Sequence, residues 1–180
     1  MAINLAWLKT NSGQLLLCLF CMHGCSGAHQ SRQAQNHLPA DLPLAVELSQ
    51  TPFYPQTEHQ CGPAALATVL QAHHVDVKPE TLSSQLYIPG RKGSLQIEMA
   101  VTARRYGMLP YHLKPDFSDL LTEIAAGNPV LVLQNLGFDW WPQWHYAVVI
   151  GYDLANNELT LRSGTTKRWQ TTFATFKNTW

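Results

Sequence analysis

The chain has 180 residues, enough for one domain or for a domain that carries a tail. Twelve Lys and Arg balance twelve Asp and Glu, so the formal net charge is zero, and only 13% of the residues are charged. This composition argues against a basic nucleic-acid-binding surface and against an acidic, solvating tail. The hydrophobic fraction of 46% and the average Gly and Pro content are typical of an ordinary globular core.

The first 25 residues have the order of an export signal. A single charge, Lys9, precedes the apolar run 15–22, and small residues follow at 24–28. The run is shorter than the roughly 20 apolar residues of a transmembrane helix. Gly24-Cys25 is similar to the cleavage point of bacterial lipoprotein signals, so we expect Cys25 to be lipidated and to anchor an exported protein at the membrane, facing the periplasm or the exterior. A plain cleaved signal, a retained anchor and a misassigned start remain alternatives.

Residues 26–42 are polar and aperiodic, which predicts a linker between this anchor and a domain over 43–180. That domain contains one cysteine, Cys61. If the signal is removed and Cys25 is lipidated, Cys61 has no disulfide partner. A lone thiol in an exported protein is either reactive or an intermolecular link.

The sequence of this domain predicts mainly helices first and strands afterwards. Pro63 suits the first turn of a helix because its missing N–H costs nothing there, and the small apolar side chains that follow it indicate burial. Turn residues at 155–157 separate two strands that pair across them. This order favours an α+β fold with segregated layers. We expect a first helix that starts just after Cys61 and ends near 72, further helices at 80–86, 95–106 and 117–126, and strands at 44–48, 130–133, 145–152, 158–162 and 168–172.

Three residue types needed for thiol catalysis occur in suitable places. Cys61 stands just before the start of a predicted helix, and the N-terminus of a helix stabilises a thiolate. A histidine must reach the sulfur to act as its base, and His145 begins a predicted strand. A side-chain amide can stabilise the tetrahedral oxyanion, and Gln56 lies shortly before the cysteine. Each residue also has a purely structural interpretation: a core cysteine, a strand histidine and a loop glutamine.

Three segments, PFYPQ (52–56), QCGPAALATVL (60–70) and HYAVVIGYD (145–153), resemble the papain-like double-glycine peptidases that trim bacteriocin leader peptides, and their stand-alone exported relatives. The resemblance covers about residues 44–180. It implies a papain-like α+β fold, with N-terminal helices packed on a C-terminal antiparallel sheet. Some exported relatives continue further, which leaves truncation of the domain at Trp180 open.

The same resemblance implies roles for individual residues. Cys61 would be the nucleophile, His145 the base and Gln56 the oxyanion donor. The chain would hydrolyse a peptide or protein substrate through an acyl-enzyme, and neither a cofactor nor a metal is implied.

The family's usual His-orienting aspartate is missing, because the corresponding place reads LRSG at 161–164. Asp153 lies eight residues along the same strand from His145, which is about 26 Å at ~3.3 Å per residue. The returning strand brings residues near 163–168 beside His145, so Ser163 is the predicted orienting position. A hydroxyl can accept from the imidazole N–H and so fix its tautomer, but it does not stabilise an imidazolium as a carboxylate does. We therefore expect a weaker peptidase, or one whose histidine another group orients.

Other segments are less informative. Trp141 and Trp144 lie in an aromatic stretch directly before His145, and they predict either a wall of the substrate cleft or a packed loop. The pair His73-His74 indicates a polar helix end rather than a metal site, since adjacent side chains on a helix diverge. Residues 89–93 (PGRKG) predict an exposed loop.

The sequence thus predicts a cysteine-type peptidase. Two alternatives stay open. The first is a catalytically weak or inactive peptide-binding module on the same fold, which the missing aspartate favours. The second is another thiol enzyme, such as an amidase or an acyltransferase.

Overall fold

The structure is a computed structural model that describes residues 38–56 and 59–180. The predicted export signal, Cys25 and most of the predicted linker lie outside these residues. At the end of the predicted linker, Leu38 and Leu42 pack against the core of the domain, so packing begins before Pro43. Within the described ranges, no helix is long and apolar enough to cross a membrane.

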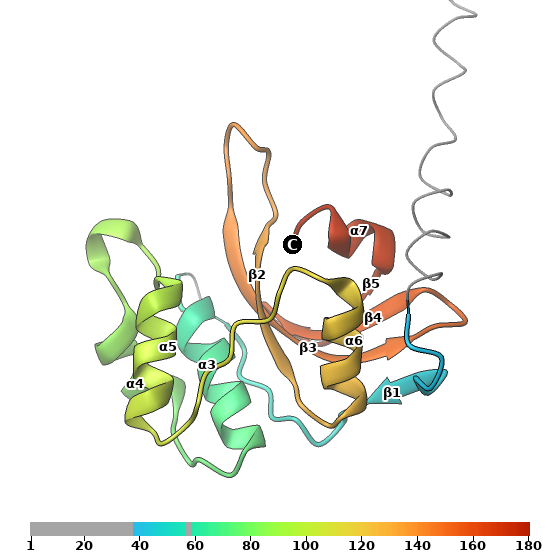
Figure 1. Cartoon of the computed structure of the whole chain (residues 1–180). Coiled ribbons are helices and arrows are strands. Elements are labelled where there is room, and N and C mark those ends of the chain that lie inside the picture. The colour runs from blue at the N-terminus through green and yellow to red at the C-terminus, as the bar shows by residue number, and fades with distance from the viewer. Residues whose placement is uncertain (1–37, 57–58) are drawn as a thin grey trace, which may run out of the picture. The chain divides into compact units, whose positions relative to one another are not determined.

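Five strands form one antiparallel sheet around a long central strand (Figure 1). The central strand, β3, pairs with β4 along one edge, and β1 and β2 pair with successive parts of its other edge. The seven residues 146–152 of β3 are all buried, which explains why this strand reads as a continuous apolar run rather than as an alternation. The strands are β1 (Ala45–Glu47), β2 (Val130–Asn135), β3 (Trp144–Asp153), β4 (Glu158–Ser163) and β5 (Thr166–Thr172).

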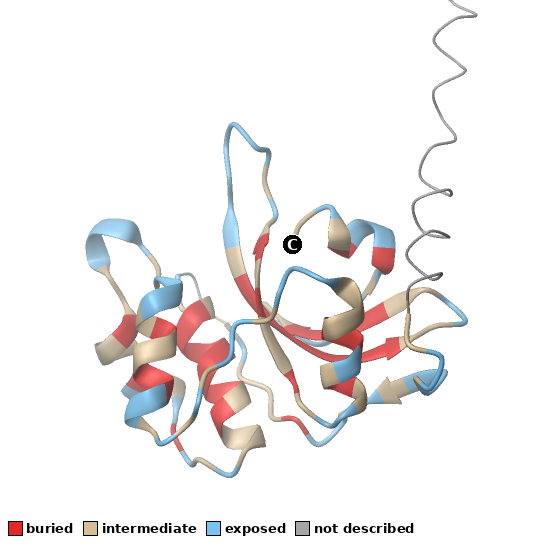
Figure 2. Cartoon of the chain, viewed as in Figure 1, coloured by how far each residue is buried: buried red, intermediate tan, exposed pale blue. Residues whose placement is uncertain are grey.

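Helices cover both faces of this sheet. The side chains of β3 alternate between two cores: Val148 and Ile150 pack against the first three helices, whereas Ala147 and Val149 pack against the last two. Buried segments of the first group of helices and of β3 are shown in red in Figure 2. The helices are α3 (Cys61–Ala72), α4 (Pro79–Leu86), α5 (Gln96–Arg105), α6 (Phe117–Ala125) and α7 (Phe173–Lys177), with a short 3₁₀ turn, η2 (Pro89–Arg91).

The predicted α+β architecture, with helices packed on an antiparallel sheet, is confirmed, and the predicted elements agree with the structure to within a few residues at their ends. The structure adds two details to this arrangement. The strand predicted at 44–48 is β1, which joins the sheet beside the far end of β3, and α6 and α7 cover the face opposite α3. A central strand that is apolar on both faces requires cover on both faces, whatever the order of the elements along the chain.

Candidate active site

A cleft of about 720 Å³ opens where the N-terminus of α3 meets the first residues of β3. Cys61, His145 and Gln56 all line it, although they come from three distant parts of the chain. The structure therefore brings these three predicted site residues to one cavity. The other side chains discussed below that line the cleft are His59, Arg91, Lys92, Ser94, Trp144 and Tyr146.

Cys61 is the first residue of α3, and its side chain is partly buried. The N-cap residue, Gln60, makes no side-chain hydrogen bond to this helix end, and its Oε1 instead accepts from the Ser83 hydroxyl at 2.8 Å. Pro63 has no N–H. The amides of Cys61 and Gly62 thus form the positive end of the helix dipole beside the thiol.

Gly62 allows the chain before α5 to approach the start of α3 closely. A Cβ built on Gly62 would lie 2.6 Å from Ser94 Oγ and 2.7 Å from Ser94 Cβ, so a larger residue would push this segment away. The Tyr146 hydroxyl donates to the Ser94 carbonyl oxygen at 3.3 Å. Burial, together with the charge of Cys61, raises the pKa of Tyr146 to about 12, so this hydroxyl remains a donor at neutral pH. These contacts close one wall of the cleft beside the thiol.

His145 lies on β3 beside the strand that returns to it. Its Nε2 atom is 3.0 Å from Oγ of Ser163, at the end of β4. Ser163 is the residue that the length of the hairpin placed beside His145. Burial lowers the pKa of His145 below its usual value, which favours the neutral imidazole at neutral pH. With Nε2 engaged by Ser163, Nδ1 is the ring nitrogen that remains for a second partner. Asp153 accepts from Asn156 at the other end of β3.

The side-chain amide of Gln56 is held in one orientation by two backbone groups. Its Oε1 accepts from the N–H of Gly164 at 3.1 Å, and its Nε2 donates to the carbonyl oxygen of Tyr146 at 3.2 Å. The backbone N–H of Gln56 also donates to the Gly164 carbonyl oxygen at 2.9 Å. Gly164 has a φ of +56°, a left-handed conformation that glycine adopts without strain. Because an amide nitrogen carries two hydrogens, Nε2 keeps one N–H beyond its bond to Tyr146.

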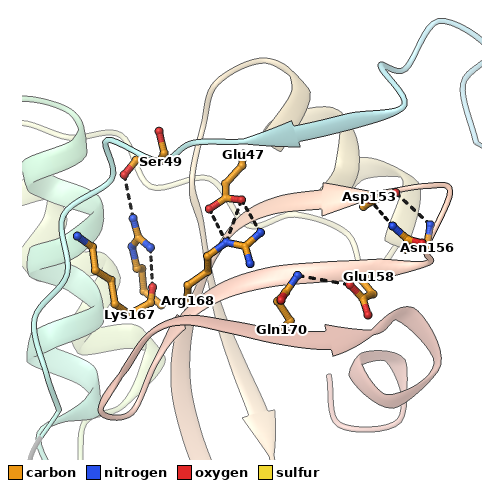
Figure 3. A network of polar contacts seen from close by, with 9 residues as sticks. Glu47, Ser49, Asp153, Asn156, Glu158, Lys167, Arg168 and Gln170 are labelled. Atoms are coloured by element: carbon orange, nitrogen blue, oxygen red, sulfur yellow. Dashed lines mark hydrogen bonds and ion pairs between the residues drawn. The ribbon is translucent and has the colours of Figure 1, made fainter.

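A buried arginine anchors the segment that leads to Gln56. Arg162 is only 4% exposed, and its guanidinium donates to the carbonyl oxygens of Ser49, Thr51 and Lys167. Nearby, Arg168 makes an ion pair with Glu47 at 2.9 Å on the surface of the sheet (Figure 3). These contacts attach the N-terminal segment to the hairpin that carries Ser163.

The aromatic stretch before His145 divides into two parts. Trp144 lines the cleft, whereas Trp141 is 65% exposed and is not among the lining residues. Of the two interpretations left open for these tryptophans, the cleft wall therefore applies to Trp144 and not to Trp141. Trp144 pairs with Asn135 as the last pair between β2 and β3, so the intervening loop extends beyond the sheet (Figure 1). At its tip the rings of Phe138 and Trp140 stack at 5.6 Å.

Sequence reasoning missed four features of this site. Gly164 was available as a turn signal directly after Ser163, but its contact with Gln56 spans 108 positions. Residues 89–92 are exposed, as predicted, yet Arg91 and Lys92 also line the cleft. His59 lines it too, and no sequence signal indicated this position. The burial of Arg162 had no signal either.

Helices packed on an antiparallel sheet form a papain-like fold, and solved peptidase structures share it. A double glycine motif protease from an AMS/PCAT transporter, in complex with a leader peptide, is 20% identical; the match covers 73% of this chain and 86% of that one at a TM-score of 0.55. A putative C39-like peptidase from Bacillus anthracis is 18% identical; the match covers 76% of this chain and 92% of that one, at a TM-score of 0.58. The peptidase domain of Streptococcus ComA, a bifunctional ABC transporter involved in a quorum-sensing pathway, is 21% identical. That match covers 73% of this chain and 93% of that one, at a TM-score of 0.56.

The model of the Peptidase_C39 like family matches residues 29–180, most of the chain. The chain therefore belongs to this family, which confirms the resemblance seen in its sequence. A comparison with curated proteins gave no match.

Proposed function

We propose that this chain is a cysteine peptidase that hydrolyses peptide bonds through an acyl-enzyme formed on Cys61. The observation that carries this proposal is the shared cleft, in which a thiol at a helix N-terminus and a histidine held by Ser163 both face the same cavity. The family and fold are those of peptidases. The leader peptide bound to one structural neighbour supports a peptide as the substrate class.

His145 acts as the base through Nδ1. The active tautomer in this mechanism carries its proton on Nε2, which donates to Ser163 Oγ 3.0 Å away, so that Nδ1 has the lone pair that takes the thiol proton. The sulfur of Cys61 then attacks the peptide carbonyl carbon and the carbonyl oxygen becomes an oxyanion. When this intermediate collapses, the C–N bond breaks and the imidazolium gives its proton to the departing amine. His145 next deprotonates a water that attacks the thioester, and the acid product leaves with the thiol restored.

Gln56 and the start of α3 stabilise the oxyanion. The second N–H of Gln56 Nε2 and the backbone N–H of Cys61 are the donors that we assign to it. Both are preorganised: the amide by Gly164 and Tyr146, and the backbone group by the helix. Trp144, on the hairpin side of the cleft, provides an apolar wall for the peptide.

A thiol-reactive peptide, such as a peptidyl vinyl sulfone, tests the proposal. We expect a covalent adduct on Cys61 of the folded full-length chain, mapped by mass spectrometry. An excess of unreactive peptide should slow its formation. The control is the same chain in denaturant with iodoacetamide, which labels Cys61 whether or not the site is catalytic. Labelling of the denatured chain alone would refute catalysis and favour a binding module.

The non-catalytic alternative has one specific observation in its favour, namely the hydroxyl of Ser163 in place of a carboxylate beside His145. A chain that binds peptides but leaves them intact would fit it. An amidase or acyltransferase would be recognised by faster turnover of isopeptide, ester or amine-acceptor substrates than of peptides.

We also propose that the protein is exported and that Cys25 carries a lipid anchor. The support is the order of charge, apolar run and small residues in the first 25 positions. Cells fed an alkyne-tagged fatty acid are expected to label the chain and the Cys21→Ala control equally. The Cys25→Ala variant should lose the label, and equal labelling of that variant would exclude Cys25 as the anchor.

A further inference from the structure

Two cations line the cleft on the turn between α4 and α5. Arg91 and Lys92 are both exposed and both belong to the cavity that contains Cys61 and His145. Among the described residues that line this cavity there is no Asp or Glu. Within the described ranges, neither cationic side chain forms an ion pair or a hydrogen bond. The cleft therefore holds two positive charges that no carboxylate of the described protein balances.

The turn that carries these cations is closed by its own backbone. Ile88 N–H donates to the Gly93 carbonyl oxygen at 2.9 Å, and Lys92 N–H donates to the Pro89 carbonyl oxygen at 3.1 Å. Lys92 itself has a φ of +49°, so the turn holds a non-glycine residue in the left-handed region. Such a conformation persists only where the surrounding contacts determine it.

The turn is also attached to the nucleophile. Ser94 follows it directly, and this side chain packs against Gly62, the residue after Cys61. The backbones of Arg91 and Lys92 thus stand at a defined position relative to the thiol. A cation at a defined position selects among ligands, whereas a cation on a mobile segment attracts all anions alike.

We propose that Arg91 and Lys92 are specificity-determining residues that bind a carboxylate of the peptide in this cleft. The proposal deepens the function proposed above, because it uses the same cleft and the same substrate class. The carboxylate belongs either to an acidic side chain close to the cleaved bond or to the free C-terminus of the peptide. Arginine offers a planar fork of donors that matches both oxygens of a carboxylate, and lysine adds a point charge.

The expected preference is moderate because both side chains are exposed. Exposed ion pairs are individually weak, so two cations should give about a three- to tenfold tighter binding of a Glu-containing peptide than of its Gln isostere. A Lys in the same position should bind more weakly than Gln. Added salt should reduce these differences, because exposed charges are screened.

The test measures binding to the full-length chain with Cys61→Ala, so that peptides are not consumed. The probes are acetylated and amidated decapeptide libraries, with Glu, Gln or Lys fixed at one position at a time. A second set has Gln throughout and a free C-terminal carboxylate, which distinguishes the two sources. We expect one of the two sets to show tighter binding of the peptides that carry the carboxylate. The double variant Arg91→Gln/Lys92→Gln should lose this preference. Arg104→Gln/Arg105→Gln removes two exposed cations of α5 that do not line the cleft, and it should keep the preference.

Equal binding of all sets, absence of binding, or a preference that survives Arg91→Gln/Lys92→Gln would overturn the inference. Turnover by the chain with Cys61 intact separates this result from the proposed function. Cleavage without any charge preference contradicts the proposed role of the two cations but leaves the peptidase function intact. A carboxylate preference without any cleavage supports that role and contradicts the peptidase.

Discussion

The variant His145→Ala is expected to form the Cys61 adduct with a peptide probe about 10²- to 10⁴-fold more slowly than the unaltered chain, which is the usual contribution of a positioned base. Without the imidazole, solvent alone takes the proton from the thiol. The second-order rate of adduct formation, measured at neutral pH with the peptidyl vinyl sulfone, is the quantity to compare. An unchanged rate would mean that His145 does not act on the thiol.

Ser163 determines how effectively His145 accelerates adduct formation at Cys61, because it contacts the imidazole ring. A hydroxyl both donates and accepts, so Ser163 can hold His145 with the proton on Nε2, which leaves Nδ1 as a base, or on Nδ1, which does not. We expect Ser163→Ala to slow adduct formation by about tenfold, because the ring loses its orientation. We expect Ser163→Asp to accelerate it by a similar factor, because a carboxylate only accepts and also stabilises the imidazolium.

The pH dependence distinguishes a positioning role from a merely structural one. Burial lowers the pKa of His145 in the present chain, so the neutral base persists as the pH falls below about 6.5, the usual histidine value. A carboxylate at 163 would favour the charged form and raise the pKa of His145. The acid limb of the rate profile should then move to higher pH in Ser163→Asp. The shift of the His145 ring proton in NMR titrations reports the same pKa directly.

Thr166→Ala is the matched control for the serine variants, since it removes a hydroxyl from the residue that pairs with Ser163 on β5. Its rate and its profile should match those of the unaltered chain. Equal rates for Ser163→Ala and Ser163→Asp, with melting temperatures preserved, would show that Ser163 does not orient the histidine.

The variant Arg162→Met is expected to lower the free energy of unfolding by about 2–4 kcal/mol. The side chain is 4% exposed, and it donates to three carbonyl oxygens on two segments. Met fills much of the same volume but donates nothing, so the carbonyl of buried Thr51 loses its partner. Denaturant unfolding followed by tryptophan fluorescence gives the free energy. Adduct formation at Cys61 should also slow, because the anchored segment leads to Gln56.

Arg168→Met is the control for this change. Arg168 is also an arginine of the β4–β5 hairpin, but its side chain is 51% exposed and its partner is the surface carboxylate of Glu47. Exposed ion pairs contribute little to stability because water and salt screen them, so the loss should be small. If the two variants lost similar free energy, the burial of Arg162 would not be what stabilises this junction.

Local patterns in the sequence determined the elements and the position of Ser163. Pro63 and the small residues after it predict α3, and the turn at 155–157 brings the end of β4 back to His145. Both inferences depend on contacts between residues that are close along the chain, where helix starts and hairpin lengths leave few alternatives. The shared location of Cys61, Gln56 and His145 was inferred from a family resemblance rather than from the residues themselves.

Only the tertiary structure decided how these parts meet. The contact of Gln56 with Gly164 joins residues 108 positions apart, and that of Arg162 with Thr51 joins residues 111 positions apart. The placement of Arg91 and Lys92 in the cleft depends on the close packing of Ser94 against Gly62. Such contacts follow from the packing of whole helices and strands against each other, which no short stretch of sequence specifies.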